Sequence, residues 1–272
     1  MKKIICFVLL VVSLFGLTGC KQNVLEKIIK KGEIVIVTSP DYPAFEFIDN
    51  SKTGQDKYVG ADIELMRYIA KELGLTLKIE ATDFDTTLAL LSTGAADLAI
   101  SGFTYKAERA ENYEMSSPYY QEGTQGILVL KSNYDNNQYN TFLKLNLAGV
   151  KVGGQSGSLQ FDYIVGQLAN STAEPFAKIA DGLLLLDTGG LKAIALASTV
   201  AENVILQQPG KYVFLEETFV VPTEETQLFV LAAKGQADLI AKINEIITKM
   251  KAEGVYEMWF QEATDLAASF TE

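Results

Sequence analysis

The hydrophobic positions in the first part of the chain repeat with two alternating periods. Residues 32–40 form an apolar run closed by a proline, which predicts a buried strand. In residues 60–74 the apolar positions recur at helical spacing before a final glycine, which predicts a helix with a glycine stop. Residues 75–84 alternate like a strand, and residues 87–102 predict a short helix, a glycine turn and a strand. This β–α–β–α–β order predicts a parallel sheet flanked by helices.

The pattern changes after Pro118. Residues 126–132 predict a strand, and residues 133–142 predict a polar loop. Residues 149–169 predict a strand, a glycine turn and a helix, and residues 183–198 predict a helix, a glycine turn and a strand. We interpret this part of the chain as a second α/β lobe whose plan is related to that of the first.

The C-terminal part returns to long, regular elements. Residues 228–235 predict another strand. Residues 237–263 predict one long amphipathic helix, followed by a second helix that holds Trp259, the only tryptophan. The chain therefore alternates strands and helices as an α/β protein does.

The first twenty residues have the features of a lipoprotein signal peptide. Lys2 and Lys3 form a basic start, and residues 4–15 form an apolar run that is too short to span a bilayer as a helix. Small residues then precede Cys20, where such peptides are cut. We predict that residues 1–19 are removed and that lipid on Cys20 tethers the protein to the membrane, outside the cytoplasm. The alternative is an ordinary secretory signal with an incidental cysteine.

Composition excludes several kinds of site. The chain has no histidine, and its two cysteines, Cys6 and Cys20, fall in the removed segment and at the anchor. We therefore expect no disulfide, no metal and no other cofactor. The formal net charge of −11 at pH 7 argues against nucleic acid, which binds basic surfaces. No later stretch reaches the ~18 apolar residues that a spanning helix needs, so we expect no second membrane segment.

Arginine is rare in this chain, since only Arg67 and Arg109 are present among 23 lysines and arginines. Arg67 falls on the polar face of the helix predicted for residues 60–74, where we expect a solvated surface charge. Arg109 follows closely after a predicted strand, at the edge where open α/β sheets bind ligands. A guanidinium matches a carboxylate with two parallel hydrogen bonds, which lysine cannot reproduce. We predict that Arg109 binds a ligand carboxylate; the alternative is an ion pair with Glu108 or Glu111.

Five motifs resemble those of the family 3 extracellular solute-binding proteins, the polar amino-acid receptors of ABC importers, and they occur in that family's order. DYPAFEF resembles the ligand loop of the first lobe. YVGADIELMRYIAKELG is similar to the family's Gly-Phe-Asp-x-Asp-Leu helix, with Ala61 in the usual aromatic place. SGFTYKAERAENYEMSSPYY is similar to the stretch that runs from Gly-x-Thr through an arginine to Ser-x-Pro-Tyr-Tyr. VGGQSGSLQFDY resembles the Gly-Ser turn of the second lobe, and EGVYEMWF resembles the C-terminal signature.

This resemblance covers nearly all of the chain after the signal peptide and implies a fold. The fold is an α/β, two-lobed, periplasmic-binding-protein-like fold of type II, with the ligand in the cleft between the lobes. Two hinge segments cross between the lobes, near residues 119–125 and 224–228. The first lobe is therefore discontinuous, and the implied boundaries are 20–122 and 228–272 for lobe 1 and 123–227 for lobe 2. The crossing explains why the β–α–β pattern changes in the middle of the chain.

The resemblance also implies ligand-binding residues in lobe 1. Gly102 would accept a hydrogen bond through its carbonyl, and Thr104 would offer its hydroxyl, beside the carboxylate held by Arg109. Tyr42 and Phe84 match positions at which the family stacks aromatic rings on the ligand side chain. The alternatives are a plain turn at Gly102 and burial of the two rings in the lobe core.

In lobe 2, the matching residues are Gln155, Gly157 and Ser158, which precede a predicted helix. The N-terminus of a helix carries unpaired N–H groups and partial positive charge, so it favours an anion. Ser158 would add its hydroxyl to the same carboxylate. The alternative is a simple helix cap by Ser156 or Ser158, and the two roles can coexist.

The chain departs from the family pattern at two acidic positions of lobe 2. Lys192 and Ala197 stand where the family usually has aspartates, and the second of these, at Ala197 here, receives the ligand's α-ammonium. A buried ammonium without a counter-ion is costly. We expect either that another acid, such as Asp41, Asp162 or Glu122, takes this role, or that the ligand is not a standard α-amino acid.

These features predict a binding protein and not an enzyme. The protein would capture a small carboxylate-bearing solute, an amino acid or a close relative, and present it to an ABC permease from the periplasmic or cell-surface side of the membrane. One alternative is a surface receptor that signals without transport. The other is an enzyme of the dehydratase kind, which needs a general acid over the substrate. The chain has no histidine, and no motif places a carboxylate there.

Overall fold

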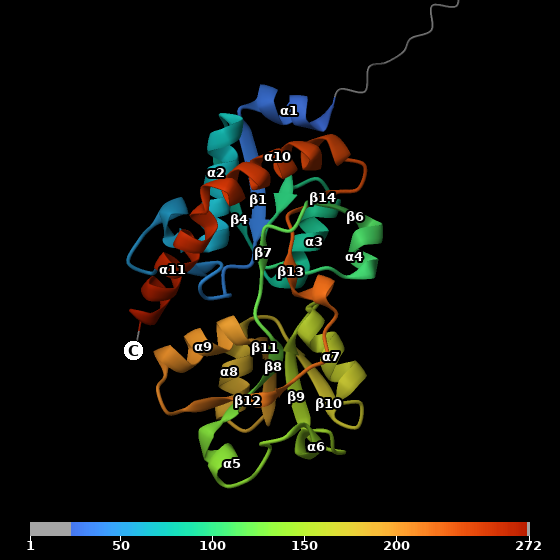
Figure 1. The fold of residues 1–272 in the computed structure, drawn as a ribbon, viewed down its shortest axis with the longest axis vertical. Helices are drawn as coiled ribbons and strands as arrows, with labels where there is room; N and C mark the ends of the chain where they lie inside the picture. Colours follow the sequence, from blue (N-terminus) through green and yellow to red (C-terminus); the bar gives the residue numbers. More distant parts are fainter. Residues whose placement is uncertain (1–22, 271–272) are drawn as a thin grey trace, which may run out of the picture.

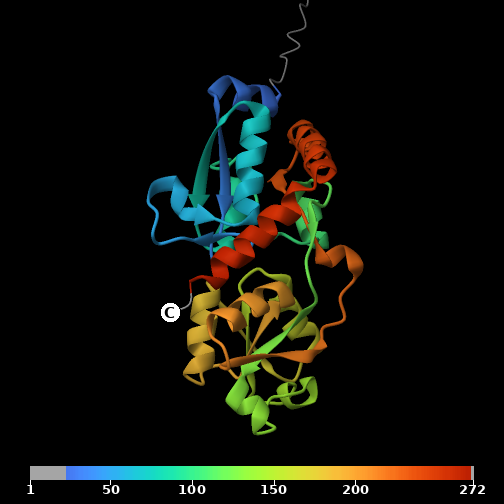
Figure 2. The ribbon, with the colours of Figure 1, turned by 60° about the vertical axis from the view of Figure 1, so that its left-hand side comes forward.

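The computed structural model describes residues 23–270 and shows two α/β lobes, one above the other (Figures 1 and 2). The predicted signal peptide and Cys20 lie outside the described residues. Within residues 23–270, no helix has both the length and the apolar character that a membrane crossing requires.

Lobe 1 is built on a five-stranded sheet in the order β4-β1-β5-β14-β6. The strands β4, β1 and β5 are parallel, as predicted, because helices connect them. β14 returns from the C-terminal part of the chain and runs antiparallel to its neighbours β5 and β6. The elements of this lobe are α1 (Val24–Lys31), β1 (Glu33–Thr38), β2 (Phe47–Ile48), β3 (Tyr58–Val59), α2 (Ala61–Leu73), β4 (Thr76–Ala81), α3 (Phe84–Ser92), β5 (Leu98–Ala99), α4 (Ala107–Asn112), β6 (Tyr113–Met115), β14 (Leu231–Ala233), α10 (Ala237–Glu253) and α11 (Val255–Ala268).

Lobe 2 has a second five-stranded sheet, in the order β10-β9-β11-β8-β12. β10, β9 and β11 are parallel, whereas β8 runs antiparallel to both β11 and β12. Its elements are β8 (Gln125–Leu130), α5 (Lys131–Asp135), α6 (Phe142–Leu145), β9 (Lys151–Gln155), α7 (Leu159–Gln167), β10 (Thr172–Phe176), α8 (Ile179–Asp187), β11 (Ala193–Ala197), α9 (Ser198–Gln207) and β12 (Tyr212–Thr218).

Two extended segments connect the lobes and pair with each other. They contain β7 (Tyr120–Gln121) and β13 (Gln227–Leu228), which form a short antiparallel ladder. Both segments run between the two lobes in Figure 2. These segments coincide with the crossings expected near residues 119–125 and 224–228. The exact residues at which one lobe ends and the other begins stay a prediction.

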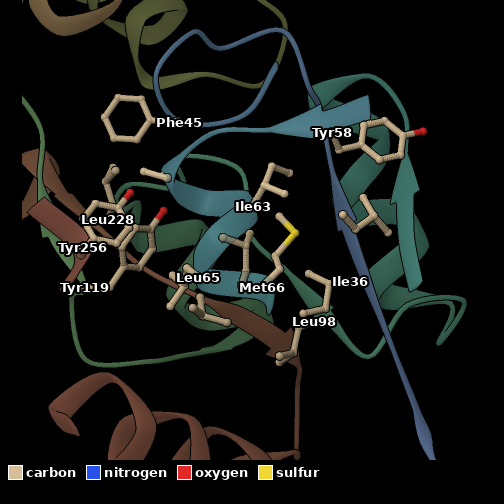
Figure 3. Packing of buried hydrophobic residues seen from close by; sticks show 14 of the residues in the cluster. Ile36, Phe45, Tyr58, Ile63, Leu65, Met66, Leu98, Tyr119, Leu228 and Tyr256 are labelled. Atoms are coloured by element: carbon tan, nitrogen blue, oxygen red, sulfur yellow. The ribbon is translucent and has the colours of Figure 1, made fainter. Parts of the chain in front are cut away.

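A buried carboxylate on α2 ties the crossing segments to the cleft. Asp62 accepts hydrogen bonds from the hydroxyls of Tyr119 (2.7 Å) and Tyr256 (2.6 Å) and from the backbone N–H of Gly102 (3.0 Å). The two tyrosine rings lie side by side in the lobe 1 core, with centroids 5.4 Å apart (Figure 3). The carboxyl group of Asp62 therefore connects the first crossing, α11 and the loop after β5 through three hydrogen bonds.

Several local predictions were wrong in detail. The predicted polar loop of residues 133–142 contains the end of α5 and the start of α6, and Lys131 begins α5 and does not extend the strand before it. The expected long helix and second helix at the C-terminus are confirmed as α10 and α11. Gly254 separates them with a φ of 66°, a conformation that glycine adopts without steric cost.

Candidate ligand-binding site

A small cavity lies between the lobes, at the carboxyl ends of β5 and β9. Its volume is about 20 Å³, so in this arrangement it holds about one water molecule. An amino-acid-sized solute can enter only if the lobes separate. The lining residues come from both lobes: Asp41, Tyr42, Glu46, Phe84, Ser101, Gly102, Thr104, Arg109, Gln155, Ser158, Leu159 and Gln160.

Arg109 on α4 is buried in this cavity without an acidic partner. Its side chain donates to the carbonyl oxygens of Thr104 and, at 3.5 Å, Gly157 of the other lobe. The guanidinium also lies 5.1 Å from the centre of the Phe103 ring. Its Nε has no hydrogen-bond partner, and within the described part of the chain Arg109 forms no ion pair. The alternative ion pair with a neighbouring glutamate is therefore not formed.

Burial lowers the pKa of Arg109 to about 10, because the charged form loses its water. The guanidinium stays charged at neutral pH, and a buried charge with an unused N–H is costly until an anion pairs with it. The arrangement is therefore suited to receive a carboxylate.

The other residues expected in lobe 1 surround this guanidinium. Gly102 adopts a φ of 56°, and a Cβ there would meet the Tyr42 ring at 3.4 Å, so glycine fits both the turn and the close contact. Its N–H is bound to Asp62, which leaves its carbonyl for a ligand. Phe84 stacks on Phe103, with ring centroids 5.0 Å apart, and also lines the cavity. Phe84 therefore packs in the core of lobe 1 and also forms part of the cavity wall.

In lobe 2, Gln155 and Ser158 line the cavity, and Gly157 contacts Arg109 through its carbonyl. Ser158 caps α7 by accepting from the N–H of Phe161 at 3.1 Å. This is the capping role that the sequence left open between two serines, since Ser156 donates instead to a lobe 1 carboxylate. The α7 N-terminus points its partial positive charge at the same region as Arg109.

Ala197 and Lys192 lie away from the cavity lining. Ala197 is fully buried at the end of β11, and α9 starts directly after it. Lys192 donates to the carbonyl of Gly189 at 2.9 Å. Neither residue brings a negative charge to the cleft, so any counter-ion for a cationic ligand must come from elsewhere.

Asp41, the first acid considered for that role, already has three partners. It accepts from the Ser39 hydroxyl (2.9 Å), the Gln155 side chain (3.0 Å) and the Ile179 backbone N–H (2.9 Å). The last two belong to lobe 2, so Asp41 bridges the lobes. Burial raises its pKa, and these hydrogen bonds oppose the rise.

Asp162 and Glu122 are likewise engaged. Asp162 pairs with Lys106 across the cleft at 2.5 Å. Glu122 accepts from the Tyr42 hydroxyl and from Gln125 (2.9 Å), at the point where the chain leaves lobe 1. Burial raises the pKa of Glu122 to about 7. Neither acid lines the cavity.

Glu46 is a cavity residue that sequence reasoning missed. It is 1% exposed, and its Oε1 accepts from the Ser101 hydroxyl at 2.7 Å, whereas its Oε2 has no partner. The sequence feature that could have indicated Glu46 is an acidic residue between two phenylalanines, Phe45 and Phe47, which are both buried. No motif pointed to Glu46, yet its carboxyl group lines the cavity.

The lobes touch directly around the cavity. Besides the bridges of Asp41 and Asp162, the Ser156 hydroxyl donates to Asp85 at 3.0 Å, and Lys178 lies 3.6 Å from Asp83. These contacts join residues of opposite lobes at the mouth of the cleft. The structure is therefore a closed arrangement of the two lobes.

A larger groove on the surface of lobe 1 is separate from this cavity. It has a volume of about 600 Å³ and lies on lobe 1, along α2 and α11. Arg67 borders it, but this arginine pairs with Glu64 and donates to the carbonyl of Tyr58 at 2.9 Å. Its side chain is 35% exposed, so Arg67 is partly solvated and, unlike Arg109, has an acidic partner.

Two α/β lobes, two crossing segments and a cavity lined from both sides are the architecture of a two-lobed solute-binding protein. The chain matches the model of the bacterial extracellular solute-binding proteins, family 3, over residues 34–262. It belongs to this family, which confirms the resemblance read from the motifs.

Relatives of known sequence are similar over most of their length. A "Probable histidine-binding protein" of Campylobacter jejuni is 26% identical over 220 residues, which cover 81% of this chain and 80% of that protein. The "Arginine-binding extracellular protein ArtP" of Bacillus subtilis is 26% identical over 268 residues, 96% of this chain and 98% of that protein.

Solved structures support the same fold. AbpA, an amino acid ABC transporter substrate-binding protein of Streptococcus pneumoniae bound to L-arginine, superposes with a TM-score of 0.80 at 30% identity, covering 91% of this chain and 99% of that one. The ancestral amino-acid-binding protein AncCDT-1, a precursor of cyclohexadienyl dehydratase, gives 0.77 at 29% identity, covering 89% and 100%. The predicted two-lobed fold is confirmed.

Proposed function

We propose that this solute-binding protein captures an amino acid or a close relative in the inter-lobe cavity and presents it to an ABC permease. The observation that carries the proposal is Arg109, which is buried between the lobes with an unused N–H and, among residues 23–270, has no acidic partner. A ligand carboxylate would supply that partner by bidentate pairing. The relatives described as binding histidine and arginine support an amino-acid ligand.

The ligand-binding residues that we propose are Tyr42, Phe84, Gly102, Thr104 and Arg109 of lobe 1. From lobe 2 we propose Gln155, Gly157 and Ser158, which approach Arg109 from the opposite side. Ala197 was also expected at the ligand; it is buried and is not among the lining residues, so we propose that it shapes the end of β11. Closure would follow from the ligand's higher affinity for the closed form.

Identification of the bound solute tests this function. The purified protein would be denatured, and the released compounds measured by mass spectrometry beside an Arg109→Lys preparation. We expect a small carboxylate at up to one equivalent in the unmodified protein and less in the variant. A released solute without an acidic group would contradict the proposal.

We also propose that the mature protein starts at Cys20 and is held on the outer side of a membrane by lipid. The sequence features of residues 1–19 support this placement. Metabolic labelling with a radioactive fatty acid tests it. Cys20→Ser should abolish the label, and Cys6→Ser, the matched control in the removed segment, should leave it. Label retained in Cys20→Ser would contradict the anchor.

An enzymatic function is a second candidate, because Glu46 places a carboxyl group at the cavity. A general acid of this kind is what a dehydratase needs. The similarity to a precursor of cyclohexadienyl dehydratase points in the same direction, although that structure is itself described as an amino-acid-binding protein. Incubation with hydroxy acids and prephenate-like compounds, followed by mass spectrometry, decides the question. We expect no turnover.

A further inference from the structure

We infer that the ligand carries an amine as well as a carboxylate, and that Glu46 receives the amine in the closed cleft. The inference rests on the proposed function, because it takes the carboxylate to be held by Arg109. It assigns to lobe 1 a counter-ion that the family usually supplies from lobe 2, where this chain has Ala197.

The argument starts from two unpaired polar atoms in one cavity. Arg109 Nε and Glu46 Oε2 are both buried, and neither has a hydrogen-bond partner. The two side chains are 4% and 1% exposed, and both line the cavity. They form no ion pair with each other within residues 23–270. The cavity thus offers the unused N–H of a buried cation and a carboxyl oxygen that has no partner among the described residues.

A single zwitterion satisfies both atoms. Its carboxylate pairs with Arg109 and its ammonium with Glu46, and no net charge enters the closed cleft. A 2-keto or hydroxy acid would pair only with Arg109 and would leave Glu46 protonated beside Asp62. An amine-bearing ligand adds a charged hydrogen bond to Glu46 that these acids cannot form, so the cavity favours it.

The other acids near the cleft are already engaged by partners. Asp41, Asp162 and Glu122 have carboxylate oxygens that already accept hydrogen bonds or pair with lysine. Asp62 accepts three hydrogen bonds. Glu46 alone among these acids lines the cavity and keeps an unpartnered oxygen in the described part of the chain.

The free protein must keep Glu46 stable when no cation is present. Burial and the nearby charge of Asp62 raise the pKa of Glu46 well above its usual range. Burial raises the pKa of Asp62 as well, but its three donors oppose that rise, so Glu46 is the more readily protonated of the two. Glu46 then holds a proton until an ammonium arrives, and binding of the ammonium displaces that proton.

The affinities of matched ligands test the assignment. The probes are the common L-amino acids, their 2-keto acids and their decarboxylated amines, screened by thermal shift and measured by calorimetry. We compare the unmodified protein with Glu46→Gln, which keeps an acceptor for Ser101 but cannot carry a negative charge. Glu64→Gln, on the outer face of α2 and away from the cavity, is the matched control.

We expect at least one amino acid to bind at least tenfold more tightly than its keto acid. Glu46→Gln should weaken that amino acid at least tenfold and leave the keto acid within about twofold, whereas Glu64→Gln should change neither. Equal weakening of both ligands by Glu46→Gln, or binding of the amine-free acids alone, overturns the inference. Acid-only binding would leave carboxylate capture intact, whereas binding of no probe would contradict the proposed function itself.

The pH dependence of the unmodified protein gives a second measurement if Glu46→Gln does not fold. Amino-acid affinity should rise with pH between 5 and 8, by up to about tenfold per unit, because one proton leaves as the ammonium binds. Keto-acid affinity should not rise in this way. The same pH slope for both ligands overturns the inference. Other ionisable groups that face Glu46 act on both ligands: Asp41, Asp62, Tyr42, Tyr119 and Tyr256.

Discussion

Arg109 is charged and buried, yet its hydrogen bonds go only to backbone carbonyls. Arg67, the other arginine, is partly exposed and has an acidic partner. The two residues have the same guanidinium group and different surroundings, and the surroundings of Arg109 are the ones that suit an anionic ligand. This contrast gives a matched pair of substitutions.

Arg109→Lys should weaken ligand binding at least tenfold, about 1.4 kcal/mol, because an ammonium cannot pair with both carboxylate oxygens. Calorimetry with the identified ligand measures the change. Arg67→Lys is the control and should leave affinity unchanged. Unchanged affinity in Arg109→Lys would remove this residue from the site.

At the residue scale, the sequence predicted most of the cavity lining and missed Glu46, Ser101, Leu159 and Gln160. Tyr42, Phe84, Gly102, Thr104, Arg109, Gln155 and Ser158 were expected and line it. Glu46 was missed because it alternates with phenylalanines, so its position looked like core. The partners of Asp41 were also beyond prediction, since Ile179 lies 138 residues further along the chain.

At the element scale, the N-terminus of α7 faces the cavity, and a serine caps this helix. Ser158 caps the helix and is 5% exposed, whereas Ser156 reaches across the cleft to Asp85. The cap leaves the other N–H groups of the first turn for an anion. The two serines are two residues apart, but Ser158 binds the first turn of its own helix and Ser156 binds a carboxylate of the other lobe.

Ser158→Ala should lower the free energy of unfolding by about 1 kcal/mol, because the helix loses its cap. It should also weaken ligand binding. Ser156→Ala should change stability by less than about 0.5 kcal/mol, as exposed substitutions do. Urea unfolding and calorimetry measure these effects. An equal stability loss in both variants would contradict the assigned cap.

The first crossing segment contains an acid that titrates near neutral pH. Burial raises the pKa of Glu122 to about 7, from an ordinary value of 4.5. The folded protein therefore binds this proton more tightly than the unfolded chain does. Stability from this group is complete below pH 4.5 and is lost as the pH rises through 7, with a total of about 3 kcal/mol.

Thermal unfolding between pH 5 and 8 should show this loss. The unmodified protein should become less stable as the pH rises, and Glu122→Gln should show a shallower fall. Other buried acids contribute to both proteins, so the difference between the two slopes isolates Glu122. Parallel slopes would mean that Glu122 keeps an ordinary pKa.

The long elements were predictable because their hydrophobic period is regular. The helix of residues 60–74 and the strand of residues 32–40 appear as α2 and β1. The short helices α5 and α6 were not predicted, since four or five residues are too few to show a helical period. Their places depend on contacts within lobe 2 that no local pattern contains.

At the scale of the whole molecule, two lobes close on a cavity too small for an amino acid. Contacts such as Lys106–Asp162 and Ser156–Asp85 hold the mouth of the cleft together. The paired segments β7 and β13 are the connections about which the lobes would move. A ligand must therefore enter an open form and favour closure by bridging the lobes.

X-ray scattering in solution tests this account most directly. The radius of gyration should fall when saturating ligand is added to the unmodified protein, because Arg109 of lobe 1 and the α7 N-terminus of lobe 2 are drawn onto one carboxylate. Arg109→Lys at the same ligand concentration should show a smaller fall. Superimposable curves, under conditions in which calorimetry shows the ligand bound, would contradict capture between the lobes.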